Sequence, residues 1–65
     1  MKFKLIGGYI EYNEETKCFS WVGEMANDAR HKFNKIQREH NLTEEVSNRL
    51  ILEELTKNKN IIRIN

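Results

Sequence analysis

The 65-residue sequence predicts a small α+β domain with the element order ββααβ, in which an antiparallel β-hairpin and a C-terminal strand pack against a two-helix hairpin. Near the N-terminus, two stretches rich in aromatic and β-branched residues alternate between polar and apolar positions, as paired strands do. From residue 26 onward, apolar residues recur every three or four positions, which is typical of helices. The chain contains no proline and no internal repeat, and a chain of this length builds one core. We therefore expect one domain over residues 1–65.

The predicted hairpin joins a strand over Lys2–Tyr12 to a strand over Lys17–Val22, with residues 13–16 as the loop. This loop length pairs Tyr12 with Lys17, Ile10 with Phe19 and Gly8 with Trp21. A glycine opposite a tryptophan leaves room for the indole to lie across the neighbouring strand. We therefore expect Gly7-Gly8 to have a structural role.

The two faces of this hairpin are both apolar. The face expected to lie in the core carries Ile6, Ile10, Tyr12, Phe19 and Trp21, and the opposite face carries Phe3, Leu5, Tyr9, Cys18 and Val22. The second set is too apolar for a face wholly given to water. Either a partner covers this face, or a β-bulge at Gly7-Gly8 turns Phe3 and Leu5 back toward the core.

The first helix is expected from about Ala26 to His40, where Ala29, Phe33, Ile36 and His40 form one apolar stripe. Asn27 is the expected N-cap, unless the helix starts early enough to include Met25. Asn41 suits the left-handed residue that ends a helix, so a very short turn leads into the second helix. Thr43 is expected to cap that helix, which runs over about Glu44 to Lys57.

The second helix is apolar on two sides. Leu42, Val46 and Leu50 share one side, and Ile51, Leu52 and Leu55 spread over the other. Because one sheet cannot bury both, we expect contact with a second body, either a target protein or a second copy of the chain. Alternatively, Ile51 packs on the first helix and Leu52 is merely exposed. Residues Asn60–Asn65 then read as a short strand with Ile62 and Ile64 on one face.

The reactive residues of the sequence do not form the set that a catalytic site needs, so we expect that the protein is not an enzyme. Cys18 is the only cysteine, Asp28 is the only aspartate, and His31 and His40 lie on roughly opposite sides of one helix. We therefore expect no catalytic residue, no cofactor and no metal ion. A single cysteine favours the reducing cytoplasm. Gly7-Gly8 ends the only stretch that starts like a signal peptide, and no apolar run approaches the roughly 20 residues of a membrane span.

The net charge of +1 implies no global field for nucleic acid. Local basic residues still allow phosphate contacts, namely Lys2, Lys4, Lys32, Lys35 and Arg38. The run from Phe33 to Leu55, with its turn and cap at Asn41-Leu42-Thr43-Glu44-Glu45-Val46, resembles the helix pair of ribbon-helix-helix DNA-binding dimers over under half of the chain. The resemblance implies a homodimeric DNA-binding regulator, in which the alternating Lys2 and Lys4 would read the groove.

The leading functional expectation is a non-catalytic protein-binding module. A chain that starts at Met1, lacks a targeting signal and keeps surplus apolar residues is typical of the small inhibitors or modulators that phages and mobile elements encode. Such a protein would occlude a larger macromolecule. The expected contact residues are Phe3, Leu5, Tyr9, Ile51, Leu52 and Leu55. The DNA-binding regulator is the alternative.

Overall fold

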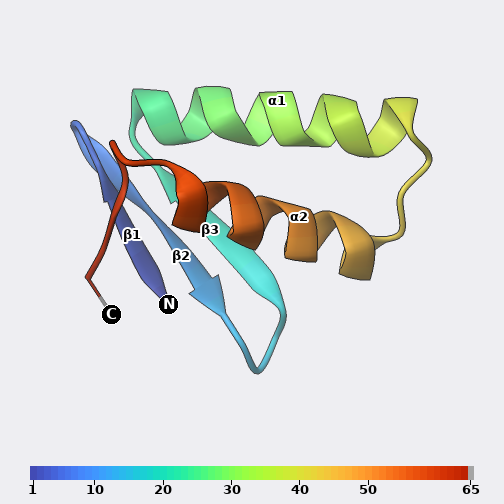
Figure 1. Ribbon diagram of the computed structural model, residues 1–65, viewed down its shortest axis with the longest axis horizontal. Coiled ribbons are helices and arrows are strands. Elements are labelled where there is room, and N and C mark those ends of the chain that lie inside the picture. Colours follow the sequence, from blue (N-terminus) through green and yellow to red (C-terminus); the bar gives the residue numbers. More distant parts are fainter. Residues whose placement is uncertain (65) are drawn as a thin grey trace.

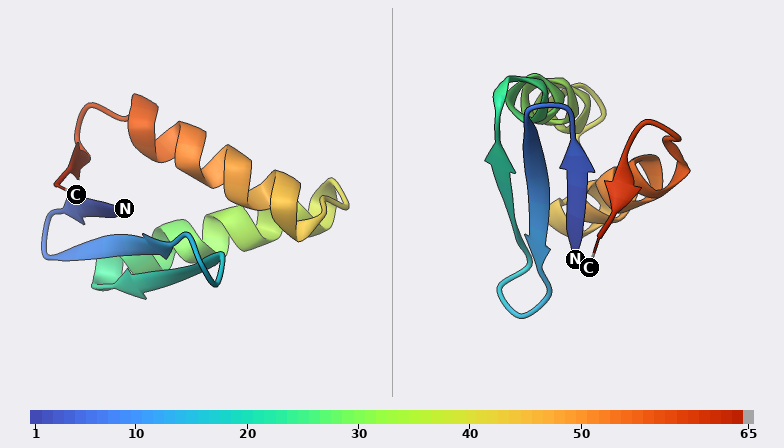
Figure 2. Two further views of the ribbon diagram at one scale, coloured as in Figure 1. Left: turned by 90° about the horizontal axis from the view of Figure 1, so that it is seen from below. Right: turned by 90° about the vertical axis from the view of Figure 1, so that its left-hand side faces the viewer.

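A four-stranded antiparallel sheet with two helices on one of its faces makes up the fold, which confirms the predicted α+β class and element order (Figures 1 and 2). The computed structural model describes residues 1–64. The elements are β1 (Lys2–Leu5), β2 (Gly8–Asn13), β3 (Cys18–Val22), α1 (Glu24–Glu39), α2 (Glu44–Lys57) and β4 (Ile62–Arg63). The strand order in the sheet is β3-β2-β1-β4, so the first strand of the chain is an interior strand.

The predicted first strand, Lys2–Tyr12, is divided into two strands by a tight turn at Ile6 and Gly7. Gly7 has a φ of 74°, in the left-handed region that glycine adopts without steric cost. The turn folds β1 back on β2 and places Phe3 opposite Ile10. Opposite residues of an antiparallel pair share a face, so Phe3 and Leu5 face the core as Ile10 does. A turn, and not a β-bulge, brings them there.

The predicted register of the β2–β3 hairpin is wrong, because the loop begins one residue later than predicted. Each residue of β2 therefore pairs with a residue two positions further along β3 than predicted. The loop consists of residues 14–17, and Asn13 pairs with Cys18, Tyr12 with Phe19 and Ile10 with Trp21. Lys17 ends the loop with a φ of 60°, and its N–H donates to the Asn13 carbonyl at 2.7 Å. The Asn13 side chain adds two bonds, because its Oδ1 accepts from the N–H groups of Glu15 and Thr16.

The corrected register still places Tyr12, Phe19 and Trp21 on the core side. Their rings form a tilted row with Phe33 of α1, and the ring centroids are 4.6 Å apart for Tyr12 and Phe19 and 5.4 Å apart for Phe19 and Trp21. Ile6 is the exception among the predicted core residues. It lies in the turn before β2 and is 81% exposed.

Gly8 lies opposite Leu5 rather than opposite Trp21. A Cβ atom on Gly8 would lie 2.0 Å from the Val22 carbonyl oxygen and 2.9 Å from the Cα atom of Gly23. The predicted structural role of Gly8 therefore rests on the backbone at the end of β3, which comes too close for any side chain.

Helix α1 begins at Glu24, after Gly23, and includes Met25, so Asn27 is not its N-cap. Ala26 and Phe33 are its buried residues, and Ala29 and Ile36 are half-buried beside them. His40 is an exposed residue just past the helix rather than part of the buried stripe, because the helix ends at Glu39. Asn41 has the expected left-handed conformation, with a φ of 52°.

Helix α2 begins at Glu44, and its predicted cap is confirmed because Thr43 Oγ1 accepts a hydrogen bond from the N–H of Val46 at 3.3 Å. The helix buries Ser47, Ile51 and Leu55 between itself, α1 and the sheet. Asn48 Nδ2 donates to the Lys17 carbonyl at 3.1 Å and so ties α2 to the hairpin loop. The core consists of Phe3, Leu5, Ile10, Ala26, Phe33, Ile51 and Leu55.

Strand β4 pairs two residues with β1, Arg63 with Phe3 and Ile62 with Lys4. The pairing continues for one residue, because the N–H of Ile64 donates to the Lys2 carbonyl at 2.9 Å. Ile62 and Ile64 are both exposed, whereas Ile61 packs against the core. Asn65, the last residue of the predicted strand, lies outside the described residues.

Candidate protein-binding surface

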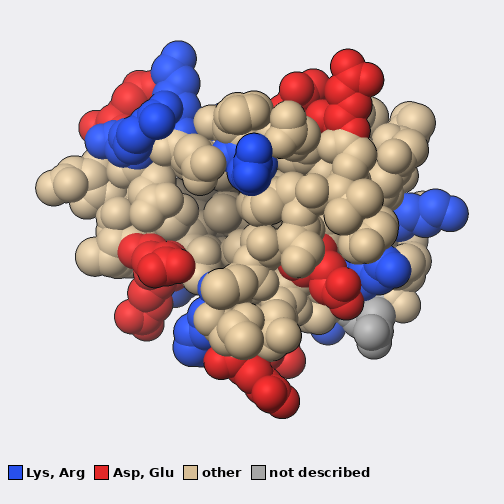
Figure 3. All heavy atoms as spheres, turned by 180° about the vertical axis from the view of Figure 1, so that it is seen from behind, with Lys and Arg blue, Asp and Glu red and all other residues tan. Residues whose placement is uncertain are grey.

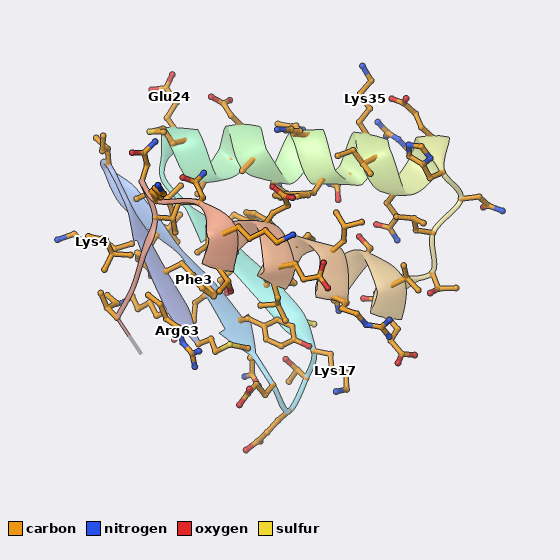
Figure 4. The ribbon with its side chains drawn as sticks, in the orientation of Figure 1. Phe3, Lys4, Lys17, Glu24, Lys35 and Arg63 are labelled. Carbon is orange, nitrogen blue, oxygen red and sulfur yellow. The ribbon has the colours of Figure 1, made fainter. Side chains whose placement is uncertain are left out.

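Four of the six predicted contact residues lie in the core, so the prediction is wrong for them. They are Phe3, Leu5, Ile51 and Leu55, with exposures between 1% and 7%. The tight turn after β1 directs the first two toward the helices, and α2 presents the other two to the sheet and α1. Figure 4 shows Phe3 between the sheet and α2. None of the four is available to a partner of the folded chain.

The other two predicted contact residues lie on different surfaces. Leu52 is a half-buried residue of α2 that packs against the edge of the core. Tyr9 is half-buried on the face of the sheet that carries no helix. On the predicted apolar side of α2, Ile51 therefore belongs to the core, and only Leu52 is partly accessible. The predicted outer sheet face keeps Tyr9, Cys18 and Val22.

The strand residues that point away from the helices form a surface that we call the open sheet face. It consists of Lys2, Lys4, Tyr9, Glu11, Asn13, Cys18, Ser20, Val22 and Ile62, together with Ile64. In the right-hand view of Figure 2, the strands face the viewer and both helices lie behind them. Figure 3, seen from behind, looks onto the side of the molecule where β3 lies, and it shows mostly uncharged residues in the middle of that side.

The register arranges the open sheet face in rows that cross all four strands. One row reads Ile62, Lys4, Tyr9 and Val22, and the next reads Ile64, Lys2, Glu11 and Ser20. Three members of the first row are apolar or aromatic, and Ile62 is 63% exposed. A sheet face turned wholly to water would carry polar residues at most of these positions. The row is therefore a candidate contact surface.

Lys2 and Tyr9 are joined on this face. The Nζ atom of Lys2 lies 4.2 Å from the centroid of the Tyr9 ring, within the range of a cation–π contact. Lys2 also lies directly opposite Glu11. The Lys2 ammonium group thus lies above an aromatic ring on a face that also carries Lys4 and Glu11.

The five predicted phosphate-contacting residues divide between two surfaces. Lys2 and Lys4 project from β1 onto the open sheet face, whereas Lys32, Lys35 and Arg38 are exposed along α1. Figure 4 shows Lys4 and Lys35 at opposite ends of the molecule. Lys35 also forms an ion pair with Glu39, with 3.8 Å between Nζ and Oε1. The structure therefore brings two of the five together and leaves the other three on a separate helix surface.

A second apolar feature lies at the end of the molecule where the β1–β2 turn meets α1. Ile6 and Met25 are exposed there, beside a shallow depression of about 330 Å³. The depression is lined by Leu5, Ile6, Met25, Ala29, Asn58, Asn60 and Ile61. Sequence reasoning missed this feature because it placed Ile6 in the core. The signal in the sequence was Gly7-Gly8, which directly follows Ile6 and is typical of a two-residue turn as well as of a β-bulge.

The residues with reactive side chains lie apart. Cys18 is an exposed free thiol on β3, and His31 and His40 are exposed on α1 and just after it. Within residues 1–64, no group of three or more His, Cys, Asp or Glu side chains is placed to hold a metal ion. In the same part of the chain, neither helix has the length and apolar character needed to cross a bilayer.

No family model, curated protein or solved structure matches the chain.

Proposed function

We propose that the protein is a non-catalytic protein-binding module, an inhibitor or modulator that covers part of a larger target with its open sheet face. The observation that carries the proposal is the row of Ile62, Tyr9 and Val22 across a sheet face on which no helix packs. Exposed apolar and aromatic side chains of this kind gain free energy when a partner removes them from water. Within this proposal, the inhibitor is of the phage or mobile-element type, in which a compact domain covers part of a larger target.

The chemistry of this face defines the kind of target. Lys4 lies within the row, between Ile62 and Tyr9, and Lys2 lies in the next row on the same interior strand, β1. The complementary surface would be apolar with acidic groups opposite these two lysines, because complementary charges select the partner and apolar contacts supply most of the affinity. We also place the protein in the cytoplasm, since the exposed thiol of Cys18 suits a reducing compartment.

The test is affinity capture from nuclease-treated lysate of the source organism with three tagged baits. The first is the unmodified chain, and the second carries Val22→Asp and Ile62→Asp on the open sheet face. The third is a matched control with Ile6→Asp and Met25→Asp, which exchanges the same number of exposed apolar side chains elsewhere. Circular dichroism checks that all three baits are folded.

We expect a stoichiometric protein on the first and third baits and its loss from the second. Loss from the third bait alone would move the contact surface to the depression beside Ile6. A partner retained by all three baits, or no retained protein at all, would contradict the proposal.

The second candidate is a homodimeric DNA-binding regulator, and the observation that favours it is the pair of lysines beside Tyr9 on one open face. Phosphate contacts make affinity fall steeply with salt, with a logarithmic slope of about −0.9 per neutralised phosphate. A steep slope that flattens in the Lys2→Met, Lys4→Met variant would support this function over protein binding. A flat salt response would exclude it.

A further inference from the structure

The outer edge of β3 is open along its whole length. β3 is an edge strand of the sheet, and in the right-hand view of Figure 2 it forms the margin of the molecule, with both helices on its inner side. Among residues 1–64, the backbone bonds of β3 run only to β2. Such an edge carries backbone donors and acceptors that another strand can pair with.

The hydrogen bonds of Tyr12 identify which groups of β3 face outward. The N–H of Tyr12 donates to the Met1 carbonyl at 2.8 Å, and the Met1 ammonium donates to the Tyr12 carbonyl at 3.0 Å. Tyr12 thus turns both of its backbone groups toward the first strand and away from β3. Phe19, which lies opposite Tyr12, therefore directs its own N–H and C=O away from β2, and Trp21 does the same two residues later.

The side chains of β3 do nothing to protect this edge. Its five residues, Cys18 to Val22, include no charged residue and no proline, the usual devices that block edge pairing. Phe19 and Trp21 are only half-buried, so the aromatic row on the core side stays partly open at this edge. The opposite edge, β4, contains only two residues.

From these observations we propose that two copies of the chain pair antiparallel through β3, around a twofold axis at Ser20, to form one continuous eight-stranded sheet. In this register Phe19 of each copy lies opposite Trp21 of the other. All four outward backbone groups of each copy are then hydrogen-bonded, in four bonds across the axis. A twofold axis at Phe19 would pair Trp21 with Lys17, and an axis at Trp21 would pair Phe19 with Gly23. Lys17 and Gly23 both have left-handed φ values, which lie outside strand geometry.

Charge complementarity supports a second copy as the occupant of the edge. Antiparallel pairing around Ser20 places the end of β3 that follows Lys17 next to the end of the other copy's β3 that precedes Glu24, so the residues flanking the joined strands have opposite charges. No like charges face each other within the strand, because β3 is uncharged. The half-buried Phe19 and Trp21 of each copy cover one another on the helix side. The open sheet faces of the two copies become one continuous face. The dimer forms without a bound target.

Sedimentation of the purified chain tests the proposal without a target. We expect twice the monomer mass, and we expect Ser20→Lys to raise the dimer dissociation constant by about tenfold or more, because two ammonium groups would meet on the axis. Ser20 is exposed and lies opposite Glu11, so the monomer tolerates the lysine. Thr56→Lys, which adds the same charge on the exposed side of α2, is the control and should leave the constant unchanged.

Disulfide trapping tests the register. Ser20 faces Ser20 of the other copy in a non-hydrogen-bonded pair with about 4.5 Å between Cα atoms, a separation that a disulfide spans. Oxidised Ser20→Cys in a Cys18→Ser background should therefore give a covalent dimer. The unmodified chain should not, because its two Cys18 residues would lie four strand positions, about 14 Å, apart.

Three results would overturn the proposal. They are a purified chain that remains monomeric, a dimer unaffected by Ser20→Lys, and a covalent dimer that forms as readily in the unmodified chain as in the Ser20→Cys variant.

Discussion

The two faces of the sheet are built from alternate residues of the same strands and have opposite roles. In β1, Phe3 is 1% exposed beneath the helices, whereas its neighbour Lys4 is exposed on the open sheet face. In β2, Ile10 is fully buried and Tyr9 is not. Stability therefore rests on the face that the helices cover, and the residues of the other face are free to contact a partner. Substitutions on the two faces should therefore have separable effects.

The largest expected effect comes from the covered face. Phe3→Ala should lower the free energy of unfolding by about 3–5 kcal/mol, because it removes a fully buried ring and leaves a cavity between the sheet and α2. In a domain of this size that loss approaches the whole stability. Urea denaturation followed by Trp21 fluorescence measures it. A loss below about 1 kcal/mol would mean that the helices do not pack on this face as described.

The two glycines at the β1–β2 turn differ in how closely other backbone atoms approach them. Gly8→Ala should cost about 2–3 kcal/mol, because its Cβ would overlap the Val22 carbonyl and force the end of β3 to move. Gly7→Ala is the control, since it has open space and only a left-handed φ, and it should cost about 1 kcal/mol. Thermal unfolding of both variants gives the difference. Equal losses would contradict the close approach at Gly8.

Leu52→Glu tests the boundary between the core and the surface on α2. Since Leu52 is half-buried against the core, the charge should lower the free energy of unfolding by about 1–2 kcal/mol. The sequence pattern favoured a different outcome, loss of association with an unchanged fold. Denaturant unfolding and sedimentation of the same sample separate the two. Unchanged stability together with lost association would restore α2 as the contact surface.

The smallest effect is expected on the open sheet face. Ile62→Thr should change the free energy of unfolding by less than about 0.5 kcal/mol, because the side chain is already in water and threonine keeps the β-branched shape. Ile61→Thr is the matched control, since its side chain packs against the core and should cost more. If Ile62→Thr proved as costly as Ile61→Thr, the two faces would not be separable at β4.

The sequence was enough to predict the element order, both helices and the cap at Thr43, because hydrophobic periodicity and capping chemistry act locally. It did not predict the turn at Ile6 and Gly7. One signal was available: in a continuous strand Phe3 and Ile10 would fall on opposite faces, and a two-residue turn removes that conflict. The loop register was hidden for another reason, because it depends on Lys17 adopting a positive φ, which lysine rarely does.

The candidate site was predictable only in part. Alternation placed Tyr9 and Val22 on the outer face, but the contact residues on α2 were misplaced because Ile51 and Leu55 belong to the stripe of α2 that packs into the core. The sequence predicted a strand at Ile62 but did not predict which strand would pair with it. That strand, β1, lies at the other end of the element order, and no local pattern encodes a pairing over that distance.

The place of β4 beside β1 has a consequence for synthesis. The ribosome delivers β1 before the other elements and β4 after them, and the pair closes only after both helices have left the exit tunnel. Until then the meander of β1, β2 and β3 has a second free edge along β1, and Phe3 lacks the cover that α2 provides. The nascent chain is therefore most exposed to misassembly and proteolysis in the interval before β4 emerges.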